Sequence, residues 1–201
     1  MLYLPNMLLV GATGRDAGKT TFVCGLLRHF HSLALAAAKV TVIRENNGEC
    51  PRGGTGCGVC SSVGDGFLLT QELSNTGNKD THRMLAAGAS RVFWLRTFLK
   101  DAEEGVLALH QKIGTDTPFI CESNSIRGVV VPGLFLMVAQ MGRSVIKASA
   151  KSVLHHADLV ITSDGTSFDF DYDQIQITSE GWRLREQPSV AVQGGEEHAG
   201  A

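Results

Sequence analysis

Residues 11–21 read Gly-Ala-Thr-Gly-Arg-Asp-Ala-Gly-Lys-Thr-Thr, and this stretch decides the fold. An apolar run at residues 7–10 precedes it, and a segment with helical periodicity at residues 21–31 follows it. A strand, a glycine-rich loop and a helix in this order are the context in which such a loop binds phosphate. Glycines let backbone N–H groups close around phosphate oxygens, and the N-terminus of the helix favours negative charge. The stretch therefore predicts a phosphate-binding loop.

The side chains of the loop predict how a nucleotide would be held. Lys19 can reach the terminal phosphates, and the Thr20 hydroxyl is placed to bind Mg²⁺. The usual pattern has a glycine five residues before Gly18, where this chain has Thr13. The alternative is a glycine-rich turn beside a chance Gly-Lys-Thr, and the flanking strand and helix patterns argue against it. The residues expected to bind the nucleotide, ATP or GTP, are Thr13, Gly14, Arg15, Ala17, Gly18, Lys19, Thr20 and Thr21.

Size and composition limit the class of protein. The chain has 201 residues, of which 43% are hydrophobic and 19% charged, with a net charge of −2. These values predict one globular nucleotide-binding domain over residues 1–190, followed by a polar, disordered tail at 191–201. The balance of charge gives no field for nucleic acid, and no basic or long apolar run suggests a membrane. Without a signal-peptide pattern, we expect a cytoplasmic protein.

Apolar runs alternate with segments of helical periodicity along the chain. This alternation predicts an α/β fold of the P-loop NTPase type, three layers with a mostly parallel sheet and helices on both faces, and a small C-terminal β-hairpin near residues 174–184. The expected strands are 7–12, 40–44, 91–95, 118–121, 134–138 and 158–162. The expected helices are 19–31, 80–87, 98–112 and 145–155.

An inserted loop at residues 44–66 is rich in cysteine and glycine. Cys50, Cys57 and Cys60 are spaced C-x₆-C-x₂-C, and five glycines surround them. Thiolates at this spacing suit Zn²⁺ or an iron–sulfur cluster, and an odd cysteine count in a reducing compartment favours metal over disulfides. A redox dithiol or a loop without metal is the alternative.

The loop does not supply a fourth ligand of its own. Cys24, Cys121 and His82 are the candidates within one chain, although burial in the core is the better interpretation of both cysteines. Two chains could instead each give Cys57 and Cys60 to one [4Fe-4S] cluster at a dimer axis. We therefore expect a homodimer.

Two resemblances follow from these motifs. The segment 11–28, with its Thr13, Asp16-Ala17 and Gly25-Leu26-x-Arg28, resembles the loop of the dethiobiotin synthetase and cobyric acid synthase group of ATP-using ligases. The segment Asn78-Lys79-Asp80-Thr81-His82-Arg83, with Ala-Gly-Ala at 87–89, resembles the accessory GTP-binding protein of molybdopterin-guanine dinucleotide biosynthesis. In that family a glycine stands where this chain has Asn78. The resemblance implies that the segment lies near the nucleotide.

Acidic residues complete the expected site. Glu122 ends an apolar strand, where an acid in phosphate-loop proteins often binds Mg²⁺ or orients the attacking group. Asp16 and Asp80 are further candidates to order the metal and its water, although Asp80 could simply cap a helix. The expected catalytic residues are Lys19, Glu122, Asp16 and Asp80. The guanine-reading Asn-Lys-x-Asp is absent, and Asp164 either reads a base edge or belongs to an Asp-Gly turn.

These patterns lead to one expected function and two alternatives. The first is an Mg²⁺-dependent ATPase or GTPase that serves as an accessory protein in metallocofactor or molybdopterin cofactor biosynthesis, with a metalloenzyme or biosynthetic protein as its partner. The second is a ligase that activates a carboxylate with ATP. The third is a nucleotide sensor with a structural zinc.

Overall fold

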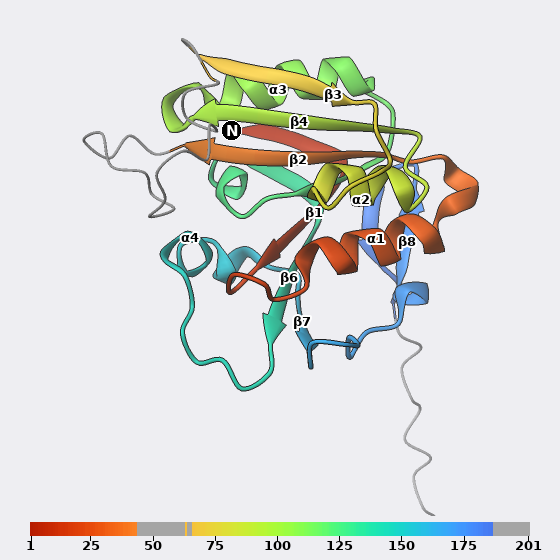
Figure 1. Ribbon diagram of the computed structural model, residues 1–201, viewed down its shortest axis with the longest axis vertical. Helices are drawn as coiled ribbons and strands as arrows, with labels where there is room; N and C mark the ends of the chain where they lie inside the picture. Colours follow the sequence, from red (N-terminus) through yellow and green to blue (C-terminus); the bar gives the residue numbers. More distant parts are fainter. Residues whose placement is uncertain (44–62, 64–65, 187–201) are drawn as a thin grey trace, which may run out of the picture.

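The computed structural model describes residues 1–43, 63 and 66–186, so the three cysteines of the 44–66 loop and the C-terminal tail lie outside the described residues. Strands and helices alternate along the described chain (Figure 1). In order, the strands and α-helices are β1 (Leu2–Ala12), α1 (Lys19–His29), β2 (Ala36–Ile43), β3 (Phe67–Glu72), α2 (Asp80–Ala86), β4 (Arg91–Phe98), α3 (Ala102–Ile113), β5 (Phe119–Glu122), β6 (Val130–Gln140), α4 (Ala148–Lys151), β7 (Leu159–Ser163), β8 (Ile175–Thr178) and β9 (Gly181–Leu184).

Seven strands form one sheet in the order β3-β4-β2-β5-β1-β6-β7. Every neighbouring pair is parallel except the β3–β4 pair at one edge. Strands β8 and β9 form a separate antiparallel hairpin. The predicted α/β fold with a mostly parallel sheet and a C-terminal hairpin is therefore confirmed. In such a sheet the carboxyl ends of the parallel strands open at one edge, which is where ligands bind.

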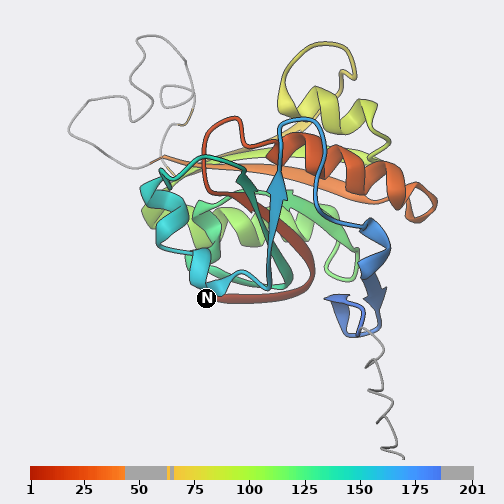
Figure 2. The ribbon, with the colours of Figure 1, turned by 90° about the horizontal axis from the view of Figure 1, so that it is seen from below.

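Two helical layers cover the sheet. Figure 2 shows α1 and α2 on one side of it and α3 and α4 on the other. Residues of β1 alternate between the two sides, because successive side chains of a strand point to opposite faces. Leu8 and Val10 belong to the core under α1, whereas Met7 and Leu9 belong to the core under α3, and all four are fully buried.

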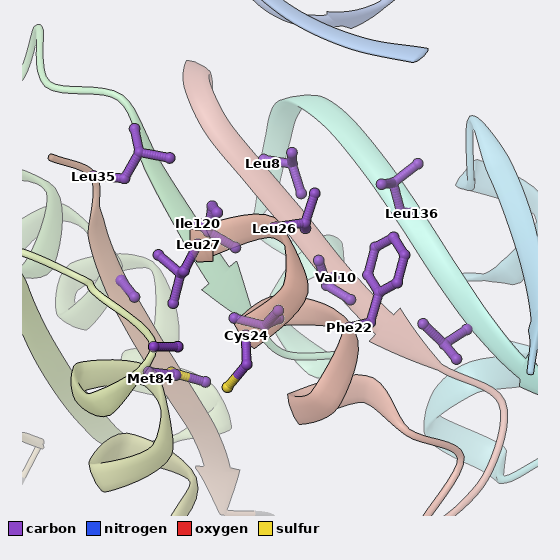
Figure 3. Packing of buried hydrophobic residues seen from close by; sticks show 14 of the residues in the cluster. Leu8, Val10, Phe22, Cys24, Leu26, Leu27, Leu35, Met84, Ile120 and Leu136 are labelled. Carbon is purple, nitrogen blue, oxygen red and sulfur yellow. The ribbon is translucent and has the colours of Figure 1, made fainter. Parts of the chain in front are cut away.

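Helix α1 is held against the sheet by an apolar stripe. Its Phe22, Leu26 and Leu27 point toward the strands, where Val10 and Ile120 lie beneath them (Figure 3). Phe22 and Leu26 are four residues apart, as are the buried Val23 and Leu27, and this spacing gives the helix one broad apolar face. This packing fixes the start of the helix, and thereby the loop before it, relative to β1.

The chain between β7 and β8 packs along one flank of α1, at the edge of the same core. The rings of Phe168 and Tyr172 contact Phe22 with centroids 5.0 and 5.3 Å apart. Gly25 makes room for this segment, because a Cβ atom there would lie 2.2 Å from the Tyr172 hydroxyl oxygen. The glycine thus serves packing and not helix formation, which it normally weakens.

We predict that Gly25→Ala destabilises the chain. In an unobstructed helix this change stabilises by about 1 kcal/mol, but here the new methyl group would displace Tyr172, and we expect a net loss of about 1–2 kcal/mol. Urea unfolding of both chains measures the difference. In a Tyr172→Leu background the obstacle is smaller, so the loss should shrink. An equal loss in both backgrounds would contradict this explanation.

Several predicted boundaries differ from the structure. Strand β3, which the sequence analysis did not predict, pairs with residues 92–97 of β4, and β2 pairs with β4 as far as Phe98, so β4 continues beyond its expected end at residue 95. The helix expected at 98–112 therefore begins at Ala102. The helix expected at 145–155 is the short α4 followed by a 3₁₀ turn, because the backbone N–H of Lys147 donates to Thr13 and leaves this residue extended.

Among the described residues, no helix has the length and apolar character needed to cross a membrane.

Candidate functional site

The loop between β1 and α1 closes tightly on itself. Asp16 and Gly18 have positive φ angles of 57° and 88°, so the chain reverses direction before the helix begins. The N–H of Thr13 donates to the carbonyl of Val138 at 2.9 Å, and the carbonyl of Thr13 accepts from Lys147 at 2.9 Å. The loop is therefore tied to β6 on one side and to the segment before α4 on the other.

A second tie joins this loop to the end of β5. The side-chain amide of Asn124 donates to the carbonyl of Ala12 and accepts from its N–H, both at 2.7 Å. Gly11 permits this approach, since a Cβ there would lie 3.0 Å from Asn124 Oδ1 and 2.9 Å from Met137 Sδ. Glu122 lies two residues before Asn124, so the bonds from the Asn124 amide also set the distance between the loop and Glu122.

Glu122 joins the first two residues of α1. Its Oε2 accepts a hydrogen bond from the Thr20 hydroxyl at 2.7 Å, and its Oε1 lies 3.3 Å from Lys19 Nζ. The Glu122 side chain is only 3% exposed. A carboxylate so deeply buried is stable only if it is paired and hydrogen-bonded, and here both conditions are met.

A lysine from β2 completes the charged cluster. Lys39 is the register partner of Glu122 across the β2–β5 pair, so both side chains lie on the same face of the sheet. Its ammonium group lies 3.6 Å from Glu122 Oε1 and also pairs with Asp80, the first residue of α2. Lys39 thereby connects two residues that are 42 positions apart and that the sequence analysis placed in one site.

The two lysines keep Glu122 ionised. Burial on its own would raise the pKa of this carboxyl, but Lys19, Lys39 and the Thr20 hydroxyl outweigh the burial and hold the pKa below its ordinary value of 4.5. The carboxylate is therefore charged at neutral pH and can act as a hydrogen-bond acceptor or metal ligand.

A pH dependence of stability follows from this lowered pKa. A carboxyl whose pKa is lower in the folded chain stabilises it above its unfolded pKa, and that stabilisation disappears as the pH falls through the folded pKa. We therefore expect the Glu122 contribution to be complete above pH 4.5 and to be lost below it. Unfolding free energies should be measured from about pH 3 to about pH 6. They should fall more steeply toward acid in the natural chain than in Glu122→Gln. Parallel curves would contradict this assignment.

Glu122, Lys19 and Lys39 line a hollow of about 740 Å³ at the carboxyl ends of the strands. Its volume is in the range of small-molecule sites. Five cationic and three acidic side chains line it, a surplus of two positive charges that favours an anionic ligand. The lining residues are Gly14, Arg15, Asp16, Ala17, Gly18, Lys19, Thr20, Thr21, Lys39, Asp80, Arg83, Glu122 and Lys147.

The structure brings most of the expected site residues to this hollow. Thr13 is an exception among the expected nucleotide-binding residues: it does not line the hollow, and its hydroxyl faces the Val138 carbonyl at 3.5 Å. Thr21 lines the wall and accepts a hydrogen bond from Arg83 at 3.0 Å. Asp16 lies in the hollow's rim with an exposed side chain.

The expected metal loop cannot be placed, because Cys50, Cys57 and Cys60 lie outside the described residues. Cys24 and Cys121 are buried in the cores on opposite faces of the sheet, as expected for packing residues. In the part of the chain that the structure describes, no three His, Cys, Asp or Glu side chains gather in a way that could hold a metal ion. The Glu122 carboxylate and the Thr20 hydroxyl, which contact each other, offer oxygen ligands from two side chains only.

Asp164 belongs to a turn. Its carboxylate accepts hydrogen bonds from the backbone N–H groups and the hydroxyls of Thr166 and Ser167, at 2.7–2.8 Å. These bonds lower its pKa far below the ordinary range. Of the two interpretations left open by the sequence, the turn is the one for which the structure supplies contacts.

Three residues of the site were missed by sequence reasoning. Lys39 had a usable signal, because it is the lone charged residue in the apolar run of β2. Asn124 follows the predicted strand end at Glu122, but its pattern did not indicate that its side chain would bond to the backbone of Ala12. Lys147 reaches the hollow only because the segment before α4 is extended, and no sequence pattern indicated this.

Comparisons with known proteins add nothing to this geometry: no family model, no curated protein and no solved structure matches the chain.

Proposed function

We propose that the chain binds and hydrolyses a nucleoside triphosphate, ATP or GTP, with Mg²⁺, and acts in the cytoplasm as an accessory protein of metallocofactor or molybdopterin cofactor biosynthesis. The observation that carries the nucleotide site is the buried Glu122, which holds Lys19 and Thr20 at the mouth of the loop. A glycine loop, a lysine and a hydroxyl in this arrangement suit a phosphate chain and its metal.

The residues present fit Mg²⁺. This ion prefers oxygen ligands and retains several waters, so it needs few protein ligands. Thr20 donates its proton to Glu122, which leaves the lone pairs of the hydroxyl oxygen available, and the Glu122 carboxylate is ionised. Thr20 would hold the ion directly, and Glu122 directly or through water. When bound, Mg²⁺ neutralises the charge that develops on the phosphate oxygens during transfer.

The chain's own groups would bind and orient the nucleotide. The backbone of residues 14–18 encloses the phosphates, and Lys19 reaches the terminal one. Arg83, Lys39 and Lys147 line the remaining walls and supply positive charge along the phosphate chain. Such fixed charges stabilise a transition state because they need no reorganisation as the reaction proceeds.

The accessory role is supported by the cysteine loop and by the molybdopterin-type segment around Asp80. Cys50, Cys57 and Cys60 would hold Zn²⁺ or an iron–sulfur cluster whose state depends on the nucleotide, and a cluster bridged by two chains would make the protein a homodimer. A ligase that activates a carboxylate is the second candidate. It is favoured by Lys39, which carries positive charge beyond Lys19 to the α2 side of the hollow.

Steady-state hydrolysis of ATP and GTP by the anaerobically purified full chain, with metal and sulfide analysis of the same sample, separates these functions. An accessory protein should hydrolyse slowly without additions and contain iron with matching sulfide, or zinc. A ligase should turn over only with a small carboxylate acceptor. A chain that neither binds nor hydrolyses either nucleotide would contradict both.

A further inference from the structure

A second, smaller hollow of about 200 Å³ adjoins the large one. The two share Lys39 and Asp80, so the smaller hollow begins where the charged cluster of Glu122 ends. Lys19 reaches the terminal phosphate in the proposed function, and the smaller hollow therefore lies at the terminal-phosphate end of the site. Its lining residues are Lys39, Asn78, Lys79, Asp80, Thr81 and Trp94.

The indole of Trp94 is held in a fixed orientation. Its Nε1–H donates to the Thr41 hydroxyl at 3.1 Å, and the guanidinium of Arg96 stacks over the ring at 4.3 Å from the centroid. Trp94 and Lys39 are register partners on β4 and β2, so the ring and the ammonium group lie side by side on one face of the sheet. A ring fixed in this way loses little entropy when a flat ligand packs against it.

Charge and size limit what the hollow can take. Two lysines and one aspartate line it, a surplus of one positive charge. Lys39 is already engaged by Asp80 and Glu122, so the exposed Lys79 is the cation best placed to pair with a ligand. One surplus charge suits a monoanion better than a phosphate monoester, and 200 Å³ is below the usual size of a drug-like pocket.

We infer that this hollow binds a second, small ligand beside the nucleotide: a planar ring that carries one carboxylate. The ring packs on Trp94, and the carboxylate pairs with Lys79 and accepts from the Asn78 amide. The inference rests on the proposed nucleotide site for its position at the terminal-phosphate end. The ligand then contacts the Lys39–Asp80 pair, through which it can alter the setting of Glu122.

The test uses 4-fluorobenzoate as probe, observed by ¹⁹F NMR line broadening with the full chain. We expect saturable binding, with neutral 4-fluorobenzamide at least about tenfold weaker because the ion pair is lost. Lys79→Met and Trp94→Leu should each weaken the probe about tenfold, while Lys112→Met, an exposed lysine on α3, should leave it unchanged. Thermal melts establish that each variant is folded. Lys79 is exposed, so Lys79→Met decides the test if Trp94→Leu unfolds.

Three results would overturn the inference. The first is no saturable broadening, the second is equal binding of the benzamide, and the third is displacement of the probe by a non-hydrolysable Mg²⁺–nucleotide, which would make the hollow part of the nucleotide site. Nucleotide affinity measured on the same sample separates the two proposals. A chain that binds nucleotide without the probe contradicts the second ligand alone, and a chain that binds the probe without nucleotide contradicts the proposed function alone.

Discussion

Replacing Lys19 by Met is expected to weaken nucleotide binding by about a hundredfold or more and to remove hydrolysis. The ammonium group is the cation that reaches the terminal phosphate, and each charge-assisted contact contributes about 1.5–3 kcal/mol. Methionine keeps the length and apolar character of the side chain, so the packing of α1 is preserved. Equilibrium binding of ATP and GTP to both chains measures the loss.

The control for this change is Lys112→Met, which removes an exposed lysine from α3 on the opposite face of the sheet. It should bind nucleotide as the natural chain does. Thermal melts are needed as well, because Lys19→Met leaves Glu122 with Lys39 as its remaining lysine partner among the described residues. If folded Lys19→Met binds nucleotide normally, the loop is not a phosphate site.

Glu122→Gln is expected to reduce hydrolysis by about a hundredfold to a thousandfold while nucleotide still binds. The amide keeps the shape of the side chain but cannot carry the charge that holds Lys19 and Thr20 in position. The change leaves two ammonium groups without their shared carboxylate, which should also destabilise the chain by about 2 kcal/mol. Single-turnover hydrolysis at several Mg²⁺ concentrations and urea unfolding measure the two effects.

Glu103→Gln is the matched control, since Glu103 is an exposed carboxylate at the start of α3 whose side chain pairs only with the chain's N-terminus among the described residues. It should change neither hydrolysis nor its Mg²⁺ dependence. Full hydrolysis by Glu122→Gln would show that the buried carboxylate serves stability alone.

Local patterns were sufficient to predict part of the fold. Helix α1 and the strands β5 and β7 have strong apolar patterns, and the structure places their ends within two residues of the expected ones. Strand β1 ends at Ala12 as expected but begins at Leu2, five residues earlier than expected. Strand β3 was not predicted because its own sequence pattern is weak. Its residues are half-exposed and alternate weakly, and the pairing with β4 supplies what its own pattern lacks.

The residues of the candidate site also fall into those that local patterns predicted and those that depend on tertiary contacts. Lys19, Thr20 and Glu122 were predicted because each lies at the end of an element with a recognisable pattern. The link from Glu122 to Asp80 could not be predicted, because it runs through Lys39. Lys39 lies beside Glu122 only because β2 and β5, which are far apart in sequence, pair in the sheet. The positions of Asn124 and Lys147 likewise follow from tertiary contacts with residues 12 and 13.

Calorimetric titration of the full chain with non-hydrolysable ATP and GTP analogues in Mg²⁺ tests the central claim most directly. The proposed site predicts saturable binding of at least one analogue, one per chain, with a dissociation constant on the order of 1–100 μM. Omitting Mg²⁺ should weaken this binding, because the Glu122 carboxylate would then repel the phosphates without a cation between them. No saturable binding of either analogue up to about 1 mM would contradict the account.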